Sequence, residues 1–392
     1  MKEDKILRNE MMPVLMLSLA LGIRQMSMTM VAPFISTYSK TLNFYTPMLA
    51  AVALGIFGLT QAIFQFPFGI LSDKFGNKIM MVIGLFQVII GLFIAFLARN
   101  IYILIFARAL QGSGAIIGVG YSWASEVVEQ DKRTKALSIV GTFVSASAAL
   151  AFALGPLMHE FMSVNMMFLV CAILLLINGI YIILFLKDNG KGENIEKEVS
   201  TYKGLKILFR NKNFIVNNIA AFINNFMMMS VFYLVPIYLN NVTGEKGIWK
   251  VFLPAILTAV IAMKVAVGFV EKGYDRGVLT TAFLIASISI CFYFKKQSYV
   301  FLLIGTILYL SAYVTLTTIL ATNVNNSVEN SYRGTANGIF NSFQYIGNFV
   351  GPLVCGAVWT HSEKFTWVVV ICVGILGLFM ISLNKGYVLR EC

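Results

Sequence analysis

Charge is what this sequence has least of. Only 12% of its 392 residues are charged, whereas an ordinary soluble domain carries about 25%. That deficit excludes a soluble protein, a coiled coil and a disordered chain. Apolar residues make up 58% of the chain, which is enough for about twelve helices of the ~20 residues that a bilayer requires. The sequence therefore predicts a protein that lies mostly within a membrane.

Residues that carry chemistry are also scarce. The chain has two histidines and five cysteines. The cysteine number is odd and shows no metal-ligand spacing, so neither a disulfide framework nor a zinc site is predicted. No pair of acids lies within an apolar run, and no glycine-rich loop is typical of nucleotide binding. These absences exclude an enzyme and an ATP-driven pump. We expect no cofactor and no metal.

Apolar runs separated by short polar breaks occur twelve times. The longest polar interval divides them into two sets of six, so we predict an N-terminal six-helix bundle over 1–187, a cytoplasmic linker over 188–212 and a C-terminal bundle over 213–392. The predicted fold class is an all-α membrane protein with twelve transmembrane helices. The runs fall at 11–37, 46–71, 79–98, 101–126, 137–159, 164–186, 213–240, 250–270, 278–294, 299–324, 337–360 and 365–384.

Basic residues set the predicted orientation. With the N-terminus inside, 20 of the 30 lysines and arginines fall in inner segments, seven in outer segments and three within the runs. Cytoplasmic loops carry such an excess, so both termini are predicted to be cytoplasmic in the inner (plasma) membrane. The net charge of +12 follows from this placement, and we expect no nucleic acid partner.

The two halves also resemble each other. Gly69 near the end of the second run corresponds to Gly268 near the end of the eighth, and Gly155-Pro156 in the fifth run corresponds to Gly351-Pro352 in the eleventh. The offsets between such pairs lie close to 200 residues. Two parallel six-helix repeats with a site between them at mid-membrane are a plan of secondary transporters.

Three basic residues lie within the runs, and no acid clearly does. An arginine at a helix centre costs at least about 2.5–3.5 kcal/mol, so we expect Arg24 and Arg108 to face the protein interior and to have partners. Lys264 lies about five residues from the end of its run, where extension of the side chain to the membrane surface is an equal alternative. The predicted cavity is electropositive, which favours anionic or neutral substrates over cationic drugs.

The loop between the second and third runs reads Gly69-Ile-Leu-Ser-Asp73-Lys74-Phe-Gly76-Asn77-Lys78. It resembles the cytoplasmic loop motif of the major facilitator superfamily, except that Asn77 stands where a basic residue is usual. Gly69 permits close helix approach, Gly76 suits a turn with positive φ, and Asp73 can face the positive end of a neighbouring helix. The resemblance implies the major facilitator fold, with two pseudo-symmetric bundles, and a gate in which Glu126 pairs with this loop. A solvated carboxylate is the alternative for Glu126.

Further motifs fit the same superfamily. Arg108-Ala-Leu-Gln111-Gly112 resembles its Arg-Ala-x-Gln-Gly motif, and Arg133 begins the basic segment before the fifth run. Gly155-Pro156 is similar to a motif of superfamily antiporters, although the glycine expected after the proline is absent. We assign Arg133, Gly155 and Pro156 to the gate, and Gln111 to the charged cavity with the three embedded cations.

Amides and one tyrosine are the candidates for substrate contact, because polar groups that converge at mid-membrane suit a ligand site. Hydrogen bonding between helices is an alternative of at least equal weight. The candidates are Asn224, Asn225, Tyr233, Asn341 and Gln344.

Several stretches, among them Ile23-Arg24-Gln25 and Pro67-Phe68-Gly69, resemble the bacterial YajR-type transporters within that superfamily, here without their soluble C-terminal domain. This resemblance implies proton-coupled efflux of small organic compounds by alternating access, with the proton gradient as the energy source. The open alternatives are exchange or uptake of an organic anion, and a membrane sensor that does not transport. We expect a small-molecule substrate, the lipid bilayer as surroundings, and a monomer with no obligatory protein partner.

Overall fold

The computed structural model describes residues 2–129, 132–186, 207–244, 247–329 and 333–384. The predicted linker over 188–212 lies for the most part outside these described residues. The first half of the chain forms six helical spans: α1 (Lys2–Val31) continued by a 3₁₀ turn (Ala32–Phe34) and α2 (Ile35–Ser39), α3 (Pro47–Phe75), α4 (Asn77–Leu97), α5 (Ile101–Ser113) with α6 (Ile116–Glu126), α7 (Arg133–Phe161) and α8 (Val164–Phe185).

The second half repeats this organisation. Its spans are α10 (Lys212–Thr243), α11 (Trp249–Glu271), α12 (Asp275–Phe292) with a 3₁₀ turn (Tyr293–Lys295), α13 (Tyr299–Asn326), α14 (Arg333–Trp359) and α15 (Glu363–Leu383). The described residues therefore contain twelve helical spans, in agreement with the twelve apolar runs. Side-chain caps fix several starts. Asn100 accepts a hydrogen bond from the Ile103 amide, and Ser362 accepts one from the Phe365 amide.

The fourth span differs from the prediction because it is broken in its middle. Gly114 and Ala115 have φ, ψ of −75°, 64° and −81°, 60°, which are inverse γ-turn values. Each turn is closed by a 2.9 Å bond, from the Ala115 amide to Ser113 and from the Ile116 amide to Gly114. A Cβ atom at Gly114 would lie 2.3 Å from the Gly84 carbonyl oxygen. The chain therefore bends where it passes directly against α4.

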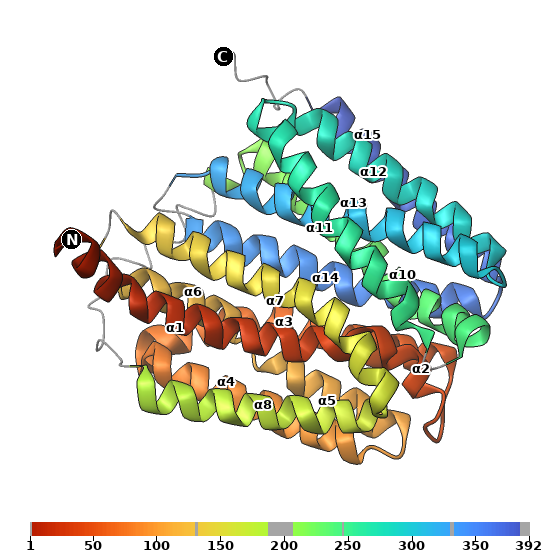
Figure 1. Cartoon of the computed structure of the whole chain (residues 1–392), viewed down its shortest axis with the longest axis horizontal. Helices are drawn as coiled ribbons and strands as arrows, with labels where there is room; N and C mark the ends of the chain where they lie inside the picture. The colour runs from red at the N-terminus through yellow and green to blue at the C-terminus, as the bar shows by residue number, and fades with distance from the viewer. Residues whose placement is uncertain (1, 130–131, 187–206, 245–246, 330–332, 385–392) are drawn as a thin grey trace.

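The internal repeat extends to the packing. In each half the first span contacts the fifth (α1 with α7, α10 with α14) and the second contacts the fourth (α3 with α5, α11 with α13). The third span contacts the fourth and the sixth in both halves as well. The predicted fold class is confirmed: the protein is all-α, with two pseudo-symmetric six-helix halves (Figure 1).

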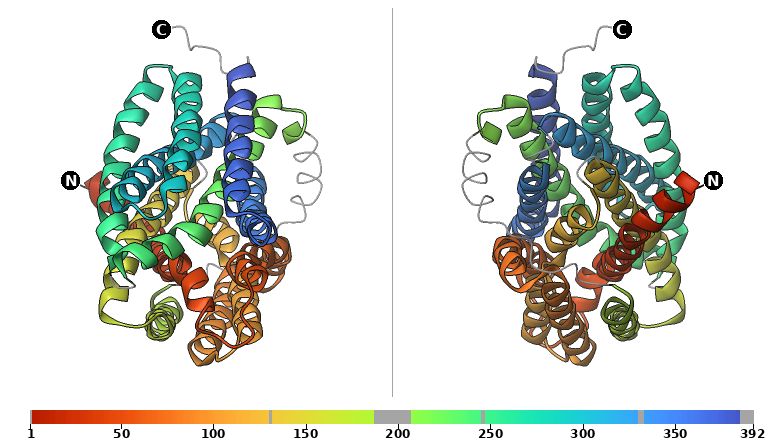
Figure 2. Two further views of the ribbon diagram at one scale, coloured as in Figure 1. Left: turned by 90° about the vertical axis from the view of Figure 1, so that its right-hand side faces the viewer. Right: turned by 90° about the vertical axis from the view of Figure 1, so that its left-hand side faces the viewer.

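The helix bundle has two ends, a proximal end and a distal end. The proximal end is where α1 begins and α15 ends, and the distal end is the opposite one; in Figure 1 the N-terminus marks the proximal end, at the left. The views along the helices in Figure 2 show the two halves as groups that meet along α3 and α14. The loops between α1 and α3 and between α14 and α15 are distal, whereas the loop between α3 and α4 is proximal.

One span among the described residues falls short of the apolar composition of a membrane-crossing helix. Eleven spans in the described residues are long and apolar enough to cross a membrane, and α14 is not among them. It carries Asn337, Asn341, Gln344 and Asn348, and it packs between α10 and α3. The helix with the most polar face thus occupies the junction of the halves, where neighbouring helices cover much of it.

Candidate functional site

The proximal loop between α3 and α4 turns at Gly76, whose φ of 93° is a conformation that glycine adopts readily. Asp73 and Lys74 are exposed at the end of α3. Among the described residues, no atom lies within 4 Å of where a Cβ would stand at Gly69, and the same holds for Gly338 near the proximal end of α14. The close helix approach that the sequence suggests for Gly69 is therefore not made in this conformation.

Glu126 is joined to this loop through Asn77, the residue that stands where the superfamily motif usually has a basic side chain. The Asn77 amide donates a 2.6 Å hydrogen bond to the Glu126 carboxylate, and the Ser122 hydroxyl donates one of 3.2 Å to its other oxygen. Lys78 donates to the carbonyl oxygens of Ile183 and Leu186, at 2.8 and 2.7 Å. An ammonium group there suits the negative end of α8. The loop thus ties α4 to α6 and to α8, while Arg133 is exposed at the start of α7.

Arg108 is only 2% exposed and is held on several sides. Its Nη1 donates to Gln111 Oε1 at 2.8 Å, its Nε donates to the Ala53 carbonyl at 3.4 Å, and its guanidinium lies 4.7 Å from the centre of the Phe57 ring. Gln111 in turn donates to the Gly91 carbonyl at 3.0 Å. The arginine and glutamine of this motif therefore fasten α5 to α3 and α4.

Arg24 is 1% exposed, and its partners are fewer. Nη2 donates to the Gly114 carbonyl at 3.4 Å, beyond the usual 2.7–3.2 Å. The guanidinium lies 5.8 Å from the Phe57 ring centre, so both buried arginines share this ring. Nε has no hydrogen-bond partner among the described residues. Both arginines are thus buried within the protein.

Two further polar side chains lie beside Arg24. Tyr345 of α14, in the second half, lies near both Arg24 of α1 and Gln61 of α3. Gln61 is fully buried, and neither atom of its amide reaches hydrogen-bond geometry with a described residue. Tyr121 of α6 is also a neighbour of Tyr345. These four residues form the central cluster: Arg24, Gln61, Tyr121 and Tyr345.

Gly155 and Gly351 make matching close contacts in the two halves. A Cβ at Gly155 would lie 2.5 Å from the Met30 carbonyl oxygen of α1, and one at Gly351 would lie 2.3 Å from the Phe226 carbonyl oxygen of α10. Both pairs are separated by the same offset along the chain. Gly155 and Gly351 thus allow the fifth span of each half to touch the backbone of the first, and Pro156 follows Gly155 within α7.

The distal ends of the halves are joined by specific contacts. The Tyr233 hydroxyl donates to the Pro47 carbonyl at 2.7 Å, and the Ser36 hydroxyl donates to the Phe232 carbonyl at 3.4 Å. The Phe152 and Phe232 rings pack edge to face with centroids 5.3 Å apart. Tyr233, a substrate candidate by sequence, therefore belongs to the closed distal end.

The remaining candidates are dispersed. Asn224 donates to Thr317 of α13 at 3.0 Å, and Asn225 donates to a carbonyl of its own helix, as expected of amides that stabilise helices. Asn341 and Gln344 are half-buried on α14 and take part in no hydrogen bond among the described residues. Lys264 is exposed on α11.

Sequence reasoning assigned no role to Phe57, Gln61 or Tyr345. The signal for Gln61 was present, because Gln61 and Gln65 are amides one turn apart within an otherwise apolar run. Phe57 and Tyr345 carried no such signal, since aromatic residues are frequent in every span.

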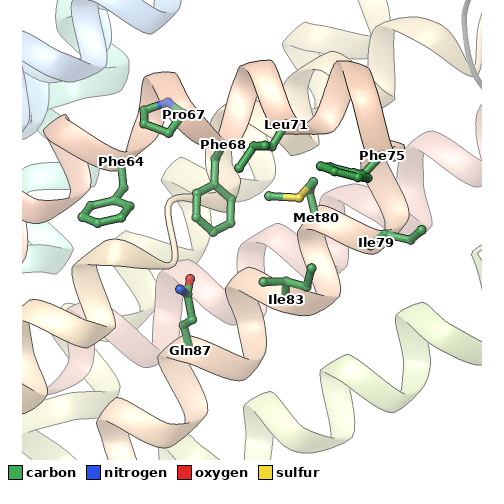
Figure 3. Close-up of a pocket in the computed structure, with 9 residues that line it drawn as sticks. All are labelled: Phe64, Pro67, Phe68, Leu71, Phe75, Ile79, Met80, Ile83 and Gln87. Atoms are coloured by element: carbon green, nitrogen blue, oxygen red, sulfur yellow. The ribbon is translucent and has the colours of Figure 1, made fainter.

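An apolar groove of about 400 Å³ lies between α3 and α4, near the proximal end. Figure 3 shows that Gln87 supplies its one amide, while the other lining side chains are apolar. It belongs to the outer face of the first half, and its other lining residues are Phe64, Pro67, Phe68, Leu71, Phe75, Ile79, Met80 and Ile83.

Comparison with known proteins adds the family. A profile of the Major Facilitator Superfamily matches residues 17–352. The inner membrane transport protein YajR of Escherichia coli is 29% identical over 342 residues, which cover 86% of this chain and 74% of YajR. The multi-drug resistance efflux pump PmrA of Streptococcus pneumoniae is 30% identical over 181 residues, 45% of each chain. The structure of the nucleoside transporter NupG superposes with a TM-score of 0.74 at 14% identity, covering 95% of this chain and 98% of NupG.

Proposed function

The chain belongs to the Major Facilitator Superfamily and is a multi-pass membrane transporter rather than an enzyme; from this we propose that it exports small organic compounds by alternating access, driven by the proton gradient. The proposal rests on one observation: the two halves are in contact at the distal end of the protein and more open toward each other at the proximal end. The halves are joined distally through Tyr233 and Pro47, whereas at the proximal end no atom of the described residues lies within 4 Å of a Cβ position at Gly69 or Gly338. Such a difference suits one of the two states of an alternating-access carrier.

The orientation of this state follows from charge. The excess of basic residues in the proximal segments favours a cytoplasmic proximal end, with both termini inside the cell membrane. On this orientation the structure is the inward-open state. Closure would bring the loop around Asp73 toward α14, and opening would separate Tyr233 from Pro47.

The direction of transport rests on the relatives. PmrA is described as an efflux pump, and export is therefore the proposed direction. Glu126 and His159 are the candidates for the proton carrier, because the spans within the described residues contain no acid away from their ends. We propose a monomer that needs no cofactor.

Exchange or uptake of an organic anion is the second candidate. It is favoured by two buried arginines, Arg24 and Arg108, with no carboxylate among their contacts in the described residues.

Proteoliposomes with an internal pH-sensitive dye test the proposal. Ethidium, norfloxacin and benzoate serve as cationic, zwitterionic and anionic probes, and liposomes without protein are the control. The expected result is that at least one probe collapses an imposed pH gradient only when the protein is present. If probes exchange across the membrane without moving protons, the second candidate holds. If the protein moves none of them, the transport proposal fails for these three classes.

A further inference from the structure

We infer that Arg24, Gln61 and Tyr345 form a binding site for an organic monoanion, with a carboxylate or a similar group held between the two halves; this deepens the proposed function and rests on it. The argument begins with the charge of Arg24. A buried cation is costly unless opposite charge and hydrogen bonds compensate it. Arg24 is 1% exposed, and the one hydrogen bond that it makes to the described residues, to Gly114, is 3.4 Å long.

Arg108 is held by more contacts than Arg24. It has a short bond to Gln111, a second bond to the Ala53 carbonyl and a close aromatic ring. A guanidinium has five N–H donors. Among the described residues Arg24 uses one of them, weakly, and its Nε is unpartnered. The donors available to a ligand are therefore on Arg24, while Arg108 serves packing.

The neighbours of Arg24 suit an anion and not a second cation. Gln61 is fully buried beside Tyr345, and neither of its amide atoms has a partner of hydrogen-bond geometry among the described residues. An anion can therefore accept hydrogen bonds from its N–H groups. The Tyr345 hydroxyl can donate as well. The carbonyl that Arg24 binds belongs to Gly114, and α6 begins two residues later at Ile116. The start of that helix adds positive potential to the same region.

A carboxylate fits these donors chemically. It accepts two parallel N–H bonds from one guanidinium and has lone pairs left for an amide and a phenol. A neutral amide of the same shape would leave the charge of Arg24 uncompensated. A primary ammonium would add a like charge. The structure thus favours the anion over its neutral and cationic isosteres.

A ligand in this site would also contact both halves of the protein. Arg24 and Gln61 belong to the first half, and Tyr345 belongs to the second. The backbones meet here, because a Cβ at Gly58 would lie 2.6 Å from the Tyr345 carbonyl oxygen. A ligand held by all three side chains bridges both halves at the junction of α3 and α14.

Binding to the purified protein tests the site without requiring transport. The probes are benzoate, its neutral isostere benzamide and the cation benzylamine, with affinity measured by isothermal titration calorimetry. We expect benzoate to bind at least tenfold more tightly than either of the others. We expect Arg24→Gln to weaken benzoate binding at least tenfold, Arg24→Lys to weaken it less, and Tyr345→Phe to weaken it several-fold.

Arg99→Gln is the matched control, because it removes the same side chain and charge from an exposed position in the distal loop between α4 and α5. It should leave benzoate binding unchanged. The inference is overturned if benzoate does not bind the wild-type protein, if benzamide binds equally well, or if Arg99→Gln weakens benzoate binding as much as Arg24→Gln. Should Arg24→Gln fail to fold, the benzoate affinities of Arg24→Lys and Tyr345→Phe are compared with that of the wild-type protein. Unchanged affinity in both variants then overturns the inference. Flux of a cationic probe without benzoate binding contradicts this site alone, whereas benzoate binding without any flux contradicts the proposed transport alone.

Discussion

The hydroxyl group of Tyr233 donates a 2.7 Å hydrogen bond to the carbonyl oxygen of Pro47, and this bond joins the second half of the protein to the first. A hydrogen bond of this kind contributes about 0.5–1.5 kcal/mol, roughly a two- to tenfold change in an equilibrium. We expect Tyr233→Phe to shift the population by that factor toward separated distal ends. Distances between spin labels on the two halves measure the shift.

Tyr238→Phe is the control for this variant. Its hydroxyl accepts a 3.0 Å bond from Trp367 within the second half, so its removal should leave the distal distances unchanged. An equal shift in both variants would show that the bond to Pro47 has no special part in closure.

The two Gly-Pro steps should be equally intolerant of a side chain. Gly155→Ala and Gly351→Ala place a Cβ at 2.5 and 2.3 Å from a carbonyl oxygen of the neighbouring helix. Overpacking of this kind costs about 1–3 kcal/mol. We expect both variants to lower the melting temperature of the purified protein. Gly179→Ala, where no atom lies within 4 Å, should not lower it, and a similar loss there would contradict the packing account.

The hydrogen bond from Asn77 to Glu126 is expected to stabilise the proximal loop. Bonds to charged groups contribute about 1.5–3 kcal/mol. In a double-mutant cycle of Asn77→Ala and Glu126→Gln we therefore expect a coupling above 1 kcal/mol, roughly, in thermal unfolding. Lys74→Ala, at an exposed position, should not couple to Glu126→Gln. Additive effects of Asn77 and Glu126 would rule out a direct partnership.

Closure of the proximal end should depend on Asp73 and Gly69. Gly69→Leu fits the open space of the present state but would obstruct the approach of α14, and Asp73→Asn would remove a charge from the proposed gate. We expect both to favour the proximal-open state, measured by the reactivity of cysteine probes placed at the proximal end. Gly179→Leu is the control, since it adds the same side chain at another open position. Unchanged reactivity in Asp73→Asn would remove Asp73 from the gate.

Much of the fold could be predicted because helix length and apolar runs are local properties. The run 164–186 corresponds to α8 (Val164–Phe185), and the run 299–324 corresponds to α13 (Tyr299–Asn326). The break at Gly114 could not be predicted in this way. The apolar sequence continues through it, and its cause lies in the backbone of Gly84 on another helix.

The central cluster was predictable only in part. Arg24 and Arg108 are conspicuous because charge is rare within the spans, and their burial follows from its cost in a membrane. Their different partners could not be inferred, since the carbonyl groups of Gly114 and Ala53 have no signature in the sequence. Tyr345 lies near Arg24 only because α14 lies against α3, a long-range contact that no local pattern encodes.

Alternating access is the central claim, and paired distances at the two ends test it most directly. Spin labels at Thr41 and Thr360 report the distal ends of the two halves, and labels at Lys74 and Lys272 report the proximal ends; all four positions are exposed. We predict two populations at each end whose proportions change in opposite directions, so that Tyr233→Phe lengthens the distal distance and shortens the proximal one. A single fixed distance at both ends, or distances that lengthen together, would contradict the account.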